Sequence, residues 1–393
     1  SSSQPGRRDQ PHSGLNDQRA ALRTVSLESS VLLPNEVSAM HRALALAERA
    51  IGLSDPNPRV GCCLLDSHGE VIGEGFTQQA GGPHAEVMAL RDAQARGASI
   101  KGSTAVVTLE PCSHHGRTPP CADALIDAGI ARVVIALGDP NPAVNGAGIN
   151  RLRAAGVSVA LAPEPFATAA RDLNVGFISR MQRGRPFVRL KAAASADGFT
   201  ALPDGRSQWI TGPQARADGH AFRRRAGAIL TGIGTVLADD PRLDVRAVET
   251  TLQPLRVIVD SHLRIAPQAR VLAAPGKACL VHAGATARAE LAGVEQIALP
   301  AADGRVDLPA LLGWLAERGV NELHVEAGAT LNGALLAAGL VDEILLYQAP
   351  VLLGRGMPIA SLPPLPDLTQ ATRWRRVEAT PVGDDLRLRL RPL

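Results

Sequence analysis

The strongest constraint on the fold is the alternation of short apolar runs with stretches of helical periodicity. Runs such as "RVGCCLLD" (59–66), "TAVVTLE" (104–110) and "ARVVIALGD" (131–139) are typical of buried strands. Residues 35–51, 83–90, 120–128 and 148–157 have helical spacing, and Asn35 can cap the first of these helices. The turn "SHGE" (67–70) joins two of the strands as a hairpin. Strands that alternate with helices predict a layered α/β sheet.

The chain is too long for one core and predicts two domains. At 393 residues it exceeds the usual size of a single domain. The basic run "SRMQRGRPFVRLK" (179–191) contains a glycine and a proline and is the best candidate for the boundary. We therefore predict a first domain over residues 34–182 and a second over residues 183–393. The polar, Ser/Arg-rich residues 1–33 are predicted to be a disordered tail.

The second half repeats the α/β pattern. Strand-like runs lie at 186–195, 208–211, 227–232, 255–260, 278–283, 321–328 and 342–353. Helical stretches include 214–225 and 329–338. Residues 373–393 predict a terminal hairpin whose basic strand covers a sheet edge, with its charges in solvent.

Composition favours small-molecule chemistry over binding of nucleic acid or membrane. The net charge is only +3 and aromatic residues make up 3%, so neither a strong phosphate-binding field nor many stacking platforms are expected. No window has the roughly 18 apolar residues of a membrane helix, and we expect no secretory signal. Five cysteines, two of them adjacent at Cys62 and Cys63, fit a reducing cytoplasm better than a disulfide framework.

One histidine and two cysteines form a candidate zinc site. His84, Cys112 and Cys121 are residue types that zinc prefers, and three protein ligands leave a fourth position for water. Each follows a proline, which suits a helix start, and helix N-termini lower thiol pKa values. Glu86 lies about 200° round a helix from His84, so we predict a proton shuttle and not a ligand.

Two alternatives accompany this prediction, together with a separate prediction for the other cysteines. His84 could be a helix-end histidine beside unrelated thiols. His114 or His115 could replace one of the ligands. The other cysteines, Cys62, Cys63 and Cys279, lie in apolar runs and are predicted to be core thiols.

Together these motifs resemble the zinc-dependent cytidine-deaminase superfamily, whose signature is H-x-E followed by P-C-x-x-C. Here eight residues separate Cys112 from Cys121 instead of two, and "TLEPCSHHGRTPPC" (108–121) is similar to the riboflavin-pathway pyrimidine deaminases. The resemblance implies a three-layer α/β/α domain that hydrolytically deaminates 2,5-diamino-6-(5-phosphoribosylamino)pyrimidin-4(3H)-one. It also implies that Asn57, in "DPNPRVG", lies near the pyrimidine, although a plain turn is the alternative.

The segment "LTGIGTVLADDPRLDVR" (230–246) places small residues and two arginines on one loop after a strand. Small residues let backbone amides approach a phosphate, which Arg242 and Arg246 could hold by charge-assisted bonds. On its own this pattern is a weak indication of function.

"KAAASADGFTA" (191–201), "SQWITGPQAR" (207–216) and "HVEAGATLNGALL" (324–336) resemble the reductase half of bifunctional riboflavin-biosynthesis proteins. That resemblance implies a dihydrofolate-reductase-like α/β domain that uses NADPH to reduce the ribosyl chain of 5-amino-6-(5-phosphoribosylamino)uracil to ribityl.

Residue by residue, the resemblance implies two sets of contacts in the second domain. The implied NADPH contacts are Ala193, Trp209, Thr235, Asp239, Ser261, and the loop Gly328, Ala329, Thr330, Leu331, Asn332, Gly333 and Ala334. The implied substrate contacts are Lys191, Ser207, Arg223, Leu243, Arg246 and Glu326. For three of these residues a purely structural role is the alternative: a helix-start carboxylate for Glu326, a strand lysine with a solvated head for Lys191, and core packing for Trp209.

Two other functions stay open at this point. The zinc domain could act on bases of nucleic acid, or one half could have lost its activity and serve as a binding or assembly surface. By resemblance we expect a homo-oligomer, a dimer or tetramer.

Overall fold

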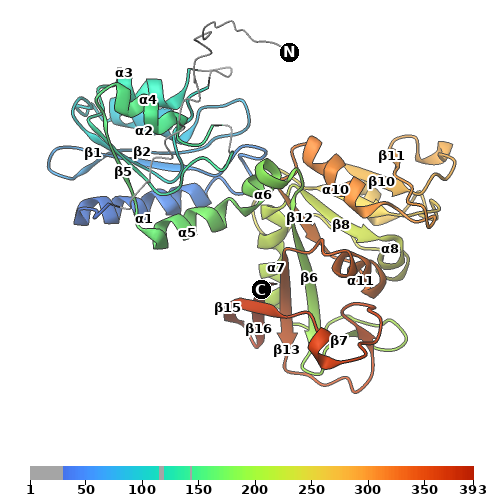
Figure 1. The fold of residues 1–393 in the computed structure, drawn as a ribbon. Helices are drawn as coiled ribbons and strands as arrows, with labels where there is room; N and C mark the ends of the chain where they lie inside the picture. The colour runs from blue at the N-terminus through green and yellow to red at the C-terminus, as the bar shows by residue number, and fades with distance from the viewer. Residues whose placement is uncertain (1–29, 115–118, 142–143) are drawn as a thin grey trace, which may run out of the picture.

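The protein is described by a computed structural model over residues 30–114, 119–141 and 144–393. The predicted tail therefore lies almost entirely outside the described residues. Two large sheets organise the described chain, one in each half, and the halves meet near helix α6 (Val175–Arg183) (Figure 1).

The first sheet has five strands in the order β2-β1-β3-β4-β5. Strand β1 is antiparallel to both of its neighbours, and β3, β4 and β5 run parallel. The strands are β1 Gly61–Leu65, β2 Val71–Phe76, β3 Thr104–Val107, β4 Arg132–Ile135 and β5 Ser158–Leu161. The other helices of this half are α1 Pro34–Glu48, α2 Ala85–Ala95, α3 Cys121–Asp127, α4 Ala147–Ala154 and α5 Glu164–Leu173. The hairpin predicted around residues 67–70 is present.

Helices cover both faces of this sheet, so the half has three layers (Figure 1). Helices α2, α3 and α4 share one apolar cluster with the sheet, whereas α1 and α5 share the cluster on the opposite face. The adjacent Cys62 and Cys63 of β1 point into these two different clusters, as alternation along a strand requires.

The start of α1 differs from the prediction that Asn35 caps it. The helix begins at Pro34, which puts Leu33 at the capping position. The Glu36 carboxylate accepts a hydrogen bond from the backbone N–H of Leu33, and Asn35 is already inside the first turn. Proline at the first helical position and a glutamate in the first turn therefore define this helix end.

The second sheet has nine strands in the order β11-β10-β9-β8-β12-β6-β13-β16-β15. All pairs are parallel up to β13, and the last two strands are antiparallel. Its strands are β6 Phe187–Ser195, β8 Ala228–Gly232, β9 Leu255–Val259, β10 Ala278–His282, β11 Glu295–Ala298, β12 Glu322–Val325, β13 Glu343–Ala349, β15 Trp374–Val382 and β16 Asp385–Pro392. A small ribbon pairs β7 Phe199–Ala201 with β14 Met357–Pro358.

Five α-helices of this half pack on the large sheet or beside it. They are α7 Pro213–Arg225, α8 Ile233–Asp239, α9 Arg270–Ala273, α10 Leu308–Glu317 and α11 Ala329–Ala337, with short 3₁₀ turns at Ala289–Leu291 and Leu368–Gln370. Helices α10 and α11 contribute to the apolar cluster on one face of the sheet, and α8 and α9 contribute to the other main cluster.

Two local predictions for this half are wrong. Residues 208–211 form a turn that leads into α7 instead of a strand, and Trp209 is 67% exposed. The segment after β8, predicted as a loop, contains α8, because Ile233 and Val236 are buried at helical spacing. Residues 329–337 form α11, as the helical spacing over 329–338 predicted, so the implied cofactor segment 328–334 is mainly a helix start and not a loop.

The terminal hairpin is present, and Arg375 and Arg376 of β15 are exposed as predicted, but the basic stripe of β16 is not solvated. The side chains of Arg387, Arg389 and Arg391 are only 12–24% exposed. Arg389 and Arg391 both donate to the Glu343 carboxylate, which is completely buried. The stripe therefore forms an ion-pair network on the sheet, because an acidic residue of the neighbouring strand β13 faces it.

Buried charges join the two halves of the chain. Arg59, which is 3% exposed, donates to the Glu322 carboxylate at 2.7 Å and to the carbonyl oxygens of Leu173 and Arg225. Arg189 and Arg225 donate to the same carboxylate. Burial alone would raise the pKa of Glu322, but the three arginines hold it well below its usual value.

No helix among the described residues is long and apolar enough to cross a membrane.

Candidate functional site

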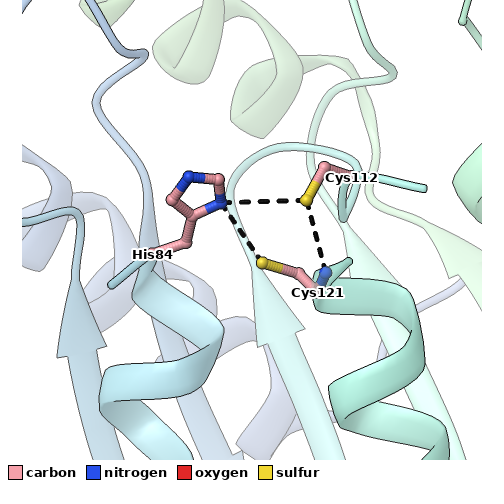
Figure 2. Close-up of side chains that lie close together, drawn as sticks. All are labelled: His84, Cys112 and Cys121. Atoms are coloured by element: carbon pink, nitrogen blue, oxygen red, sulfur yellow. Dashed lines mark hydrogen bonds between the residues drawn. The ribbon is translucent and has the colours of Figure 1, made fainter. Parts of the chain in front are cut away.

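The three predicted zinc ligands converge on one point of the first half (Figure 2). His84 Nδ1 lies 3.3 Å from Cys121 Sγ and 3.8 Å from Cys112 Sγ, and all three ligand atoms lie within 4.8 Å of one another. Tetrahedral zinc with usual bond lengths would separate nitrogen and sulfur ligands by about 3.5 Å. The donor types and their spacing therefore fit a zinc ion.

Two helix starts and one loop hold these side chains. His84 occupies the capping position of α2, and Cys121 is the first residue of α3. Cys112 does not start a helix, contrary to the prediction. Its sulfur instead accepts the backbone N–H of Cys121 at 3.3 Å, so it still lies at the N-terminus of α3. The contact with Cys121 and the nearby His84 lower the pKa of the Cys112 thiol to about 4, which favours the thiolate that binds metal.

Glu86 lies in the first turn of α2 and is only 3% exposed. The sequence argument excluded Glu86 as a ligand because it would lie about 200° round a helix from His84. That argument does not apply, because His84 caps α2 and is not inside the helix. Burial raises the pKa of Glu86, and its carboxyl group interacts with all three candidate ligands. The structure thus brings the predicted proton shuttle next to the metal cluster.

Sequence reasoning missed Glu110, which fixes the loop that carries Cys112. Its buried carboxylate accepts hydrogen bonds from the backbone N–H groups of Asp139, Gly146, Gly148 and Ile149, at 2.9–3.2 Å. These bonds tie the end of β3 to the start of α4. The available signal was an acidic residue at the end of an apolar strand, directly before the Pro-Cys motif.

The alternative ligands have different positions. His114 is exposed and does not belong to the cluster, and His115 lies outside the described residues. Cys62, Cys63 and Cys279 are completely buried in apolar clusters, as core thiols would be. Asn57 is half-buried in a turn, where its backbone carbonyl accepts the Ser54 hydroxyl; the structure places it two residues from Arg59.

In the second half, three predicted substrate contacts gather around a fourth, Glu326, directly after β12. Arg223 donates to both of its carboxylate oxygens, at 2.6 and 2.8 Å. Lys191 also interacts with Glu326 electrostatically, and these partners hold the pKa of Glu326 well below its usual value despite burial. Arg246 joins the group through Asp244, whose carbonyl oxygen accepts Arg223 and whose carboxylate accepts Arg246.

Two further histidines border this cluster and were not predicted. His324 is completely buried on β12 and lies 3.1 Å from a Glu326 oxygen through its Nε2. His220 is 8% exposed on α7, and its Nδ1 accepts the backbone N–H of Arg246. Burial and the nearby arginines Arg223 and Arg246 lower the pKa of His220 to about 4, so it is neutral at physiological pH.

Several predicted cofactor contacts lie just after the parallel strands β8, β9 and β12. Thr235 in α8 is close to Gly328, since a Cβ atom there would meet its Oγ1 at 3.6 Å. Leu331 would similarly meet a Cβ atom on Gly232 at 3.6 Å, so the starts of α8 and α11 lie side by side. Ser261 follows β9, and Ala193 lies on β6 opposite Tyr347.

The remaining predicted contacts are less clearly gathered. Trp209 is exposed, and the Arg216 guanidinium lies 4.3 Å from its ring centre, so core packing does not describe it. Asp239 is exposed at the end of α8, and Ser207 is half-buried in the turn before Trp209. Leu243 is 3% exposed with its side chain in an apolar cluster, so only its backbone is available to a substrate.

Comparison with known families gives independent evidence for both halves. The model described as "Cytidine and deoxycytidylate deaminase zinc-binding region" matches residues 34–137, and the model described as "RibD C-terminal domain" matches residues 186–388. The riboflavin biosynthesis protein RibD of Escherichia coli is 46% identical over 366 residues, which cover 89% of this chain and 98% of that protein. The chain belongs to the RibD family.

Other RibD proteins agree over the same length. RibD of Aquifex aeolicus is 38% identical, with 88% of this chain and 96% of that protein covered. A crystal form of Acinetobacter baumannii RibD has a TM-score of 0.82 at 41% identity and covers 91% of this chain and 99% of its own. A Thermotoga maritima structure, titled as a diaminohydroxyphosphoribosylaminopyrimidine deaminase/5-amino-6-(5-phosphoribosylamino)uracil reductase, has a TM-score of 0.81 at 32% identity and the same coverage. The family and the two-part fold class predicted from the sequence are confirmed.

Proposed function

We propose that this chain catalyses two consecutive steps of riboflavin biosynthesis. The first is hydrolytic deamination of 2,5-diamino-6-(5-phosphoribosylamino)pyrimidin-4(3H)-one. The second is reduction of the ribosyl chain of 5-amino-6-(5-phosphoribosylamino)uracil. The observation that carries this conclusion is the presence on one chain of both RibD halves, with a His/Cys/Cys cluster in the first. The predicted bifunctional enzyme is confirmed, and zinc and NADPH are its cofactors.

In the deaminase half, His84, Cys112 and Cys121 would hold the zinc ion. Bound zinc supplies Lewis acidity that makes water a nucleophile at neutral pH. Glu86, buried beside the ligands, takes a proton from the attacking water and gives a proton to the leaving amine nitrogen, which departs as ammonia. Asn57 binds the pyrimidine in this proposal.

In the reductase half, NADPH supplies the hydride, and the chain's own residues bind and orient the reactants. We assign NADPH to the two helix starts around Thr235 and Gly328, together with Ser261 and the other predicted cofactor contacts. We assign the phosphoribosyl group to Arg223, Arg246 and Glu326, with Lys191, Ser207 and the backbone of Leu243. The close grouping of Arg223, Arg246 and Glu326 around Asp244 supports this assignment.

The organisation of the chain completes the proposal. We place the deaminase domain at residues 34–182 and the reductase domain at 183–393, which accords with the end of α6 at Arg183 and the start of β6 at Phe187. The partners are small molecules and not nucleic acid or membrane. We further propose a homo-oligomer, dimer or tetramer, in the cytoplasm; the exposed edge strand β15 offers a surface for a second copy.

Replacement of Glu86 by glutamine tests the deaminase assignment. The amide has nearly the same shape but cannot accept and return a proton, so we expect deamination to fall by at least about 100-fold. Bound zinc, measured by atomic absorption, and reduction of the uracil substrate with NADPH should stay at wild-type levels. The control Glu70→Gln removes an exposed carboxylate from the turn between β1 and β2 and should change neither activity. Near wild-type deamination by Glu86→Gln would refute the assignment.

A further inference from the structure

The reductase half contains a buried aspartate that organises three arginines. Asp244 is 1% exposed, and its carboxylate accepts Arg242 at 2.7 Å and Arg246 at 2.8 Å. We propose that Asp244 is a positioning residue that holds Arg242 and Arg246 as a preformed clamp for the substrate phosphate. This inference rests on the proposed reductase function and adds Asp244, which the sequence analysis did not single out, as the residue that positions the two arginines.

The backbone around Asp244 is fixed, so the carboxylate has a defined position. The preceding Leu243 adopts a φ of 54°, which turns the chain sharply, and its side chain is buried. On the other side, Val245 exchanges two backbone hydrogen bonds with the Gln253 side chain, at 2.9 and 2.8 Å. Two long arginine side chains are thus attached to a rigid point, which reduces the conformational entropy lost when they bind a ligand.

Asp244 also connects the clamp to the rest of the candidate site. Its carbonyl oxygen accepts the Arg223 guanidinium at 3.0 Å, while Arg223 keeps its paired bonds to Glu326. The backbone N–H of Arg246 is held by His220. One residue therefore sets the positions of Arg223, Arg242 and Arg246 relative to one another.

Charge and exposure favour an anion at this place. Three guanidinium groups face the two carboxylates of Asp244 and Glu326, and Lys191 adds a further cation beside Glu326, so the cations outnumber the carboxylates. The side chains of Arg242 and Arg246 are 37% and 51% exposed, although the carboxylate between them is buried. Their outer N–H groups remain accessible, and guanidinium groups match phosphate oxygens in fork geometry. A phosphate monoester is the ligand class that fits.

The test compares Asp244→Asn with the wild-type protein. Inorganic phosphate binding is titrated calorimetrically with saturating NADP⁺ present, so that the cofactor site is filled. The reductase KM and kcat are measured for the phosphorylated substrate. Loss of the positioning contact should weaken phosphate binding and raise the KM, each about tenfold, with kcat within twofold of wild type, because misplaced charges lose binding without changing the hydride step.

Tighter phosphate binding by Asp244→Asn than by the wild-type protein would overturn the proposal. If Asp244 only competed with the ligand for the arginines, its neutralisation would raise the net charge and tighten phosphate binding. Unchanged binding would overturn it equally. The control Glu249→Gln removes a negative charge from the same loop at an exposed position and should leave phosphate binding unaltered.

A second variant keeps the test valid if Asp244→Asn does not fold. Arg242→Met removes a partly exposed member of the clamp and should also weaken phosphate binding about tenfold while circular dichroism stays unchanged. Wild-type affinity in this variant would contradict the clamp. If the wild-type protein fails to reduce the uracil substrate, the proposed function is wrong, and the phosphate titration alone still decides whether the clamp exists.

Discussion

Replacement of Arg59 by methionine should loosen the junction between the two halves. Arg59 is buried and donates to Glu322, Leu173 and Arg225, which lie on both sides of the junction. Methionine fills much of the space but leaves two carbonyl oxygens unpaired and removes one of the three cations around Glu322. Removal of one partner of a buried ion pair typically costs 3–5 kcal/mol, and the two remaining arginines place this case near about 3 kcal/mol.

The assay is thermal unfolding followed by circular dichroism and calorimetry. For domains of this size about 1 kcal/mol shifts the Tm by roughly 2–4 °C, so we expect a decrease of about 6–12 °C. The control Arg42→Met breaks an ion pair with Glu74 in which the arginine side chain is 59% exposed. Exposed pairs contribute little, so its Tm should fall by no more than about 2 °C. Equal shifts in the two variants would refute the argument that burial makes the Arg59 contacts strong.

Two further predictions concern the metal loop and the reductase cluster. In Gly148→Ala the new Cβ atom would lie 2.0 Å from the Pro111 carbonyl oxygen, so the loop before Cys112 must shift. A chelator should therefore remove zinc faster from this variant than from wild type. The control is Gly313→Ala, whose Cβ atom meets nothing within 4 Å and which should lose zinc at the wild-type rate. Equal rates would show that the loop tolerates the shift. The pKa of His220 is lowered from 6.5 to about 4, so unfolding takes up a proton between these pH values and stability falls as pH drops through that window. His220→Gln should therefore lose less Tm than wild type between pH 7 and 5, and parallel pH profiles of the two proteins would contradict this.

Local patterns predicted the parts of the fold that depend on local interactions. The hairpin of β1 and β2 followed from apolar runs flanking a turn, and α7 and α11 followed from helical periodicity. The metal cluster could also be predicted, because each of His84, Cys112 and Cys121 belongs to a short motif with a proline beside it. The exact helix starts could not be predicted. Cys112, predicted at a helix start, lies instead in a loop that passes the N-terminus of α3.

Ion pairs between residues far apart in the chain could not be predicted from the sequence. Arg59 and Glu322 are 263 positions apart, and no periodicity connects them. The terminal arginines were interpreted as solvated because their partner Glu343 lies on another strand. Glu110 and Asp244 were missed for a similar reason: a carboxylate that organises backbone N–H groups or arginines looks in sequence like any other acidic residue. Their importance becomes visible only when burial and partners are known.

Strand β12 has a consequence for how the enzyme's halves depend on each other. Its four residues begin at Glu322, which is held by Arg59 of the deaminase half, and are followed at once by Glu326, which pairs with Arg223. An extended strand of this length spans about 13 Å and does not stretch. A reductase half separated near residue 183 would lose one of the arginines around the buried Glu322 carboxylate, at the start of the strand that leads directly to Glu326. The first half of the chain thus helps to hold the strand that carries the candidate site of the second half.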